Sequence, residues 1–233
     1  MSQYERTAML LGEDGIRLLK GSRVAVFGIG GVGSYAAEAL VRAGVGHVTV
    51  VDNDVVSQSN INRQLIALQS TVGEYKCEVF ARRAADIDPT VTVEPVICFV
   101  TRDNIDSFKL ESFDFVIDAV DNVAAKVAII KQCKQYGVEV ISCMGTGNKL
   151  YPQMLEVTDI YKTKGCPLAR VMRSRLKKEG IESLSVVFSA EEPIKTGQRL
   201  PGSVSFVPSV AGLIAAGEAV RYIASGKVKK GQE

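Results

Sequence analysis

The chain has 233 residues, of which 46% are hydrophobic and 23% are charged, and its formal net charge is +2. This composition excludes a low-complexity protein and fits a globular enzyme built on one large α/β domain. The five cysteines are widely spaced and odd in number, which argues against a disulfide framework. Because the sequence shows no signal peptide, the cysteines predict a reducing, cytoplasmic location.

Apolar periodicity predicts alternating helices and strands over the first two thirds of the chain. In chain order these are a helix at 5–20, a strand at 23–28, a helix at 32–43, a strand at 47–52, a helix at 73–86, strands at 91–98 and 114–119, a helix at 122–136 and a strand at 138–143. This alternation indicates a doubly wound, Rossmann-like, mostly parallel sheet. The rest predicts a strand, a basic helix, a strand, a loop and a last helix. We expect a single domain over 1–233, with a nucleotide-binding core at 1–144 and a C-terminal elaboration at 145–233.

A glycine-rich turn follows the first predicted strand and comprises Gly28, Gly30, Gly31 and Gly33. Glycines at this spacing let backbone N–H groups approach a phosphate at a helix N-terminus. Asp52 closes the next strand, where a carboxylate binds the hydroxyls of a ribose. These features fit an NAD enzyme and an ATP enzyme equally. A Walker motif is excluded because Ser34 occupies the position of its lysine.

Polar residues downstream of Asp52 favour a triphosphate over a nicotinamide. They are Asp54, Asn60, Arg63, Gln64 and Lys76. Arginine and lysine neutralise phosphate oxygens, and an asparagine amide orients them. Asp121 and Asn122 follow another apolar strand, at the sheet edge where open α/β proteins bind ligands. A carboxylate that faces phosphates there is most simply a Mg²⁺ ligand. Asp54 could equally cap a turn.

Six sequence elements, in order, resemble the ubiquitin-activating-enzyme-like adenylating superfamily, which includes molybdopterin- and thiamin-pathway adenylyltransferases. They are G-x-G-G-x-G from Gly28, R-A-G-V-G from Arg42, V-D-x-D from Val51, S-N-x-N-R-Q from Ser59, G-x-x-K from Gly73 and D-N at Asp121. The resemblance implies ATP and Mg²⁺ as cofactors, with the ribose on Asp52 and the metal on Asp121. It places the phosphates on Asn60, Arg63 and Lys76. It also implies a homodimer, in which Arg6 reaches the partner's nucleotide; the predicted catalytic residues are Arg6, Arg63, Lys76 and Asp121.

Three later segments, 164–173, 189–193 and 202–208, resemble the tRNA threonylcarbamoyladenosine dehydratase subfamily. This resemblance implies adenylation of the threonine carboxylate of a modified adenosine in the tRNA anticodon loop, followed by cyclisation with loss of AMP. Sulfur-carrier adenylyltransferases usually bind zinc through two C-x-x-C pairs, and the sequence contains none. A sulfur-relay protein partner remains possible on the sequence alone.

The segment 162–178 carries seven basic residues and no acidic one. The predicted RNA contacts are Lys162, Lys164, Arg170, Arg173 and Lys177. If 167–178 is helical, Leu168, Met172 and Leu176 form its packing face. The alternative is a solvated amphipathic helix with no RNA contact.

Two further features have simple structural interpretations. Cys166 precedes Pro167 and a predicted helix N-terminus, which lowers thiol pKa values, but an intramolecular cyclisation needs no enzyme thioester, so we interpret it as structural. The other four cysteines are expected to be small buried hydrophobes. The apolar segment 208–224 is short for a membrane span and is interrupted by charges, so we expect a buried or dimer-interface helix and no membrane.

Three other functions compete with the dehydratase interpretation. A carrier-protein adenylyltransferase would share the ATP site but accept a flexible Gly-Gly tail. An NAD-dependent dehydrogenase would explain Gly28 to Asp52 but leave Arg63, Lys76 and Asp121 without a role. A non-catalytic nucleotide-binding scaffold would have lost the phosphate-binding cations.

Overall fold

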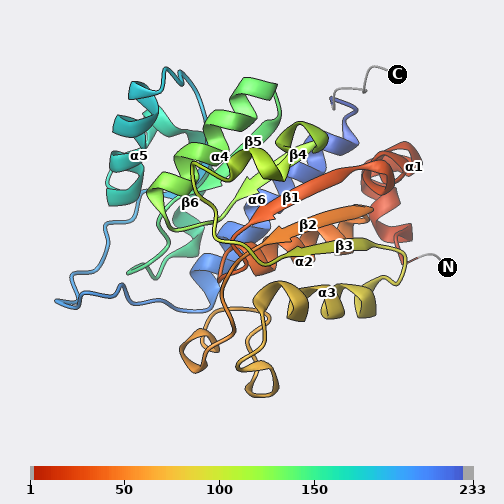
Figure 1. Cartoon of the computed structure of the whole chain (residues 1–233), viewed down its shortest axis with the longest axis horizontal. Coiled ribbons are helices and arrows are strands. Elements are labelled where there is room, and N and C mark those ends of the chain that lie inside the picture. The colour runs from red at the N-terminus through yellow and green to blue at the C-terminus, as the bar shows by residue number, and fades with distance from the viewer. Residues whose placement is uncertain (1–2, 228–233) are drawn as a thin grey trace.

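The computed structural model describes residues 3–227, whose strands form a seven-stranded sheet in the order β3-β2-β1-β4-β5-β7-β6 (Figure 1). The strands are β1 (Arg23–Phe27), β2 (His47–Val51), β3 (Thr92–Val96), β4 (Phe115–Asp118), β5 (Glu139–Cys143), β6 (Leu155–Asp159) and β7 (Ser185–Ser189). Neighbouring strands pair parallel, except that β6 is antiparallel to β7. The chain order reverses between β1 and β4, so a ligand crevice is expected at their carboxyl ends.

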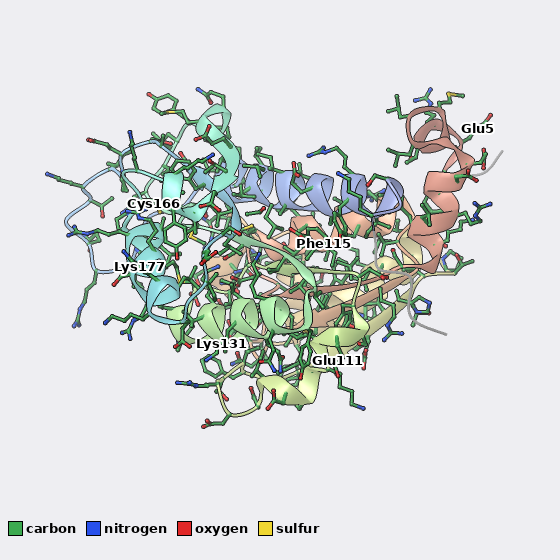
Figure 2. The ribbon with its side chains drawn as sticks, turned by 90° about the horizontal axis from the view of Figure 1, so that it is seen from above. Glu5, Glu111, Phe115, Lys131, Cys166 and Lys177 are labelled. Carbon is green, nitrogen blue, oxygen red and sulfur yellow. The ribbon has the colours of Figure 1, made fainter. Side chains whose placement is uncertain are left out.

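Helices cover both faces of the sheet, as Figure 2 shows from above. One face is covered by α1 (Glu5–Gly21), α2 (Gly33–Ala43), α3 (Lys76–Ile87) and α6 (Phe206–Ala224). The other face is covered by α4 (Val123–Tyr136) and α5 (Pro167–Lys178). The central strands contribute alternate side chains to the two cores, so in β1 Val24 and Val26 face α2 while Ala25 and Phe27 face α4.

The structure confirms the predicted elements and shifts some of their ends. Gly73 takes φ +94° and Tyr75 is extended, so α3 begins at Lys76 and not at residue 73. Strand β3 ends at Val96, and Cys98 therefore lies in a loop, half-buried, so the expectation that it is a buried hydrophobe is wrong. Helix α1 bends at Gly12, whose φ of +74° is not helical.

Helix α6 is a core helix that packs on α2. By length and composition alone it could cross a membrane, but half of the segment is buried inside the protein. A Cβ at Gly212 would lie 2.2 Å from the carbonyl oxygen of Val32, so the two helices touch through their backbones. Pro208 packs against Gly31 of the glycine turn, with its Cβ 3.2 Å from where a Cβ on Gly31 would be. The C-terminal helix therefore supports the start of α2 directly.

Candidate functional site

The glycine turn links β1 to α2 at the switch point of the sheet. Gly28 has φ +86°, and a Cβ on Gly33 would lie 1.7 Å from the carbonyl oxygen of Gly28, so both positions require glycine. At Gly30 the nearest atom to such a Cβ would be Gln64 Nε2, 3.8 Å away. Protein atoms therefore pack tightly against Gly28 and Gly33 but leave space beside Gly30. Such space is what the close approach of a phosphate to backbone N–H groups requires.

Asp52, Asp54 and Lys76 form one cluster beside this turn. Asp52 accepts hydrogen bonds from the backbone N–H groups of Ile29 (2.7 Å) and Asp54 (2.9 Å), which fixes the glycine turn to the end of β2. The buried Lys76 Nζ lies 2.8 Å from Asp54 Oδ2 and 4.0 Å from Asp52 Oδ2. Asp54 is exposed and Asp52 is not, so a phosphate could replace Asp54 as the partner of Lys76 without disturbing Asp52.

The S-N-x-N-R-Q segment lies against the glycine turn. Asn60 accepts a hydrogen bond from the Ser57 N–H at 3.1 Å, and its Nδ2 donates to no group among residues 3–227. Arg63 Nη1 donates to the carbonyl oxygen of Ser59 at 2.9 Å, which holds the guanidinium in place. Gln64 is buried, and its Oε1 has no hydrogen-bond partner in the described part of the chain. These amide and guanidinium groups are therefore held in position, while the Asn60 amide N–H groups and Gln64 Oε1 have no hydrogen-bond partner among the described residues.

The β4–α4 loop brings Asp121 and Asn122 to the same edge. A Cβ on Gly28 would lie 2.8 Å from the carbonyl oxygen of Ala119, so this loop contacts the glycine turn. Asn122 is the N-cap of α4 and accepts a hydrogen bond from the Ala125 N–H at 3.0 Å. Asp121 is exposed and makes no hydrogen bond or ion pair with the described residues. The two predicted residues therefore differ, because Asn122 shapes the helix end whereas the Asp121 carboxylate is available.

The donor set at Asp121 fits Mg²⁺ bound through phosphates. Residues 3–227 contain no group of three or more His, Cys, Asp or Glu that would hold a metal by itself. Mg²⁺ commonly takes one or two carboxylates and completes its shell with phosphate oxygens and water. A single free carboxylate beside a glycine turn matches that pattern.

Loops from the second half of the chain close over this edge. Asn62 Nδ2 donates to the carbonyl oxygen of Ser203 at 3.0 Å, which joins the S-N-x-N-R-Q segment to the chain before α6. Asn148, with φ +58°, accepts a hydrogen bond from the Gly202 N–H through its side chain and donates its own N–H to the Gly202 carbonyl oxygen. The loops near residues 148 and 202 are therefore fixed to each other and to the S-N-x-N-R-Q segment.

A model of the ThiF family matches residues 4–232. The chain belongs to the ThiF family. The tRNA threonylcarbamoyladenosine dehydratase of Bacillus subtilis (strain 168) is 41% identical, and the alignment covers 94% of each chain. The Molybdopterin-synthase adenylyltransferase of Salmonella typhimurium (strain LT2) is 37% identical over 61% of this chain and 57% of its own. These matches confirm the predicted resemblance to the adenylating superfamily.

Solved structures of this ThiF-family fold agree with the sequence relatives. The crystal structure of Escherichia coli TcdA, a tRNA N6-threonylcarbamoyladenosine dehydratase, in complex with ATP superposes with a TM-score of 0.91 at 36% identity. It covers 98% of this chain and 96% of the TcdA chain. The predicted α/β fold with a C-terminal elaboration is thereby confirmed.

The ThiF-family chain also has a buried ion pair that the motif analysis missed. Lys126 is completely buried in α4, and its Nζ donates to Asp118 Oδ2 (3.0 Å), Ser142 Oγ (3.1 Å) and the carbonyl oxygen of Cys143 (2.8 Å). These groups lie directly beneath the β4–α4 loop. Helical spacing could have indicated that Lys126 is buried, because it shares a helix face with the apolar Ile130.

A second buried group lies under the loops that follow β5. Lys149 is buried and donates to the carbonyl oxygen of Ser189 at 2.9 Å, while Glu191 accepts the N–H groups of Leu150 and Tyr151. Burial lowers the pKa of Lys149, and nearby Cys166 and Glu191 partly oppose this shift. Cys166 is itself buried, as its structural interpretation requires.

Arg6 lies far from the glycine turn of its own ThiF-family chain. Helix α1 is fixed to the amino edge of the sheet, where the Tyr4 hydroxyl donates to Asp88 after α3. Figure 2 shows Glu5, the neighbour of Arg6, at the opposite end of the molecule from Cys166. Arg6 is exposed there and cannot reach the glycine turn of the same chain.

The predicted RNA contacts divide into two groups. Lys162, Lys164, Arg170 and Lys177 are exposed. Arg173 is half-buried, and its Nη1 donates to the carbonyl oxygen (3.0 Å) and the hydroxyl of Thr163. Arg173 therefore holds the segment before α5 in place, and the packing face of α5 is Ala169, Met172 and Leu176, with Leu168 only partly buried.

Proposed function

We propose that the chain is an ATP-dependent dehydratase of threonylcarbamoyladenosine in tRNA, which adenylates the threonine carboxylate and then releases AMP as the side chain cyclises. The observation that carries the proposal is the meeting, at one sheet edge, of an open glycine turn, the Asp52–Lys76 cluster and the free Asp121 carboxylate. An NAD site has no use for these charges. The identity to dehydratases over nearly the whole chain supports the choice of substrate.

In the adenylation step the side chains neutralise charge on the triphosphate. Asp52 binds the ribose, while Asn60, Arg63 and Lys76 contact phosphate oxygens, and Lys76 exchanges Asp54 for a phosphate. The substrate carboxylate is already ionised at neutral pH, so its attack on the α-phosphorus needs no protein base. The bond from the α-phosphorus to the bridging oxygen breaks, and pyrophosphate leaves. Mg²⁺ beside Asp121 would supply further charge neutralisation.

In the cyclisation step the chain mainly holds the adenylate and excludes water. An atom of the substrate's own side chain attacks the activated carbonyl, and AMP departs with the oxygen of the former carboxylate. Proximity within one molecule lowers this barrier without a further catalyst. The loops near residues 148 and 202, joined to Asn62 through Ser203, are placed to cover the adenylate.

The proposal includes a cytoplasmic homodimer. Arg6 would reach the distal phosphates of the partner's ATP, since it lies at the wrong end of its own chain. The reducing location is supported by five cysteines that are all unpaired. A sulfur-relay protein partner stays a prediction.

The test is AMP release from ATP and Mg²⁺ by the purified chain, with tRNA that carries threonylcarbamoyladenosine and with the same tRNA unmodified. We expect AMP only with the modified tRNA, together with a loss of one water in the mass of the nucleoside. AMP with neither tRNA would contradict the proposal. Pyrophosphate release and a carrier adenylate formed with a sulfur-carrier protein instead would support the alternative that the 37% identical Molybdopterin-synthase adenylyltransferase suggests.

A further inference from the structure

A groove runs along α4 on the face of the sheet that also carries α5. It has a volume of about 560 Å³ and lies between α4, the C-terminal end of α5 and the 3₁₀ turn η3 (Ile105–Phe108). We call it the α4–α5 groove. Its lining extends from Asn122 in the nucleotide site to Gln135 near the end of α4. At about 1.5 Å per helical residue, this is a path of about 20 Å that begins at the reaction site.

The charge of the α4–α5 groove is positive. Four exposed cations line it, namely Arg102, Lys131, Arg175 and Lys178, against the two carboxylates Asp106 and Glu179. Lys131 Nζ is 2.6 Å from Glu179, which leaves its other two N–H donors available. Hydrogen bonding to Lys131 lowers the pKa of Glu179. Arg175 and Lys178 line the groove whereas Arg170 and Lys177 do not, so this surface differs from the one that the basic periodicity predicted.

One buried polar atom also lies at the groove. Gln132 lines it, is buried and donates from Nε2 to Asp106, which leaves its Oε1 without a partner in the described part of the chain. A buried acceptor without a donor is costly, and a ligand donor would relieve it. An amide acceptor beside fixed cations suits a nucleotide, which offers base or sugar donors next to phosphates.

We propose that the α4–α5 groove binds single-stranded RNA of the tRNA substrate, namely the nucleotides next to the one that enters the nucleotide site. This inference rests on the proposed function and extends it, because it assigns Arg102, Lys131, Arg175 and Lys178 to phosphates. The volume is that of a small-molecule site, which admits unstacked nucleotides but no duplex. Among the described residues that line the groove none is aromatic, so binding rests on charge and depends strongly on salt.

The test compares two double variants that remove equal charge. Lys131→Ala/Lys178→Ala removes two groove cations, one of which pairs with a glutamate. Arg82→Ala/Lys134→Ala removes two exposed cations outside the groove, one of which likewise pairs with a glutamate. The readouts are KM for the modified tRNA, Kd for the tRNA at several salt concentrations, and ATP-induced thermal stabilisation, which reports an intact fold and ATP site.

We expect the groove variant to raise KM and Kd about tenfold and to reduce the slope of log K against log salt by about 1.4, while the control stays within about twofold of wild type. Equal effects of the two variants would overturn the groove assignment. If wild type bound tRNA but formed no AMP, the proposed function would fail while the Kd comparison still decided the groove. Inhibition by a poly-glutamate peptide, and none by an anticodon stem–loop, would assign the groove to an acidic protein segment and overturn the RNA proposal.

Discussion

Lys126 Nζ lies 3.0 Å from Asp118 Oδ2, and both side chains are completely shielded from solvent. The pair joins α4 to β4 just below the loop that presents Asp121. Removing either side chain would leave the other as a buried charge whose desolvation cost is no longer offset by an opposite charge.

The first prediction is that Lys126→Met destabilises the protein by about 3–5 kcal/mol, because Asp118 keeps its buried charge without an opposite charge beside it. The melting temperature should fall by about 2–4 °C for each kcal/mol in a chain of this size. Arg17→Met is the control, since it breaks an exposed pair with Asp14 and should cost at most about 1 kcal/mol. Equal losses in the two variants would show that the buried pair has no special role.

The second prediction concerns the phosphate-binding cations. Arg63→Ala and Lys76→Ala should each lower ATP-dependent AMP formation by a factor on the order of 10² or more, because each removes a fixed charge from the transition state. The melting temperature should change little. Arg82→Ala, on the exposed side of α3, should keep wild-type activity. Near-normal AMP formation by both site variants would show that these cations do not serve the phosphates.

The third prediction tests whether Arg6 acts across a dimer. Arg6→Ala and Lys76→Ala homodimers should both be nearly inactive. Mixing and re-associating them should restore about one quarter of wild-type activity, because half of the dimers then hold one site with both native groups. Activity is measured as AMP formation before and after mixing. No recovery, with heterodimers verified by mass, would argue that Arg6 does not contribute from a partner.

The fourth prediction is that iodoacetamide at pH 8 labels Cys98 first among the five cysteines. Burial raises the pKa of Cys77 and of Cys143 to about 12, so both remain protonated until far above pH 8, and raising the pH to 9 should not label them. Cys133 has its pKa raised by burial as well. Mass spectrometry of digested protein follows each site.

Cys166→Ala completes that experiment. The variant should retain AMP formation, since the proposed reaction passes through no enzyme thioester. Rapid labelling of Cys166 in the native protein, or loss of the cyclised nucleoside in the variant, would contradict its structural role.

Local sequence signals were sufficient to predict which residues gather around the glycine turn. Asp52 and Asp121 follow apolar strands, and parallel strands bring their carboxyl ends to one edge, so their proximity could be predicted from sequence. The exact pairing of Lys76 with Asp54 could not, because it depends on where α3 begins.

The parts of the site that come from the second half of the chain were harder to predict from the sequence. The loops near Asn148 and Gly202 have no periodicity, and their shape comes from hydrogen bonds between residues more than fifty positions apart. Lys126 was overlooked because a lysine within a helix is usually solvated. The α4–α5 groove was not predictable either, since Arg175 and Lys178 belong to the basic segment 162–178 but Arg102 and Lys131 come from two other segments.

The backbone contact between Gly212 and Val32 affects whether the proposed nucleotide site can be transferred to another protein. The sequence pattern of residues 1–144 suggests a self-contained nucleotide-binding module. In the structure, however, the start of α2 packs on α6, and at Gly212 the two helices are too close for any side chain to fit between them. A fragment cut after β5 would expose the apolar underside of the glycine turn to water. Protein engineers who wish to graft the proposed ATP site onto another scaffold therefore need to carry α6 with it.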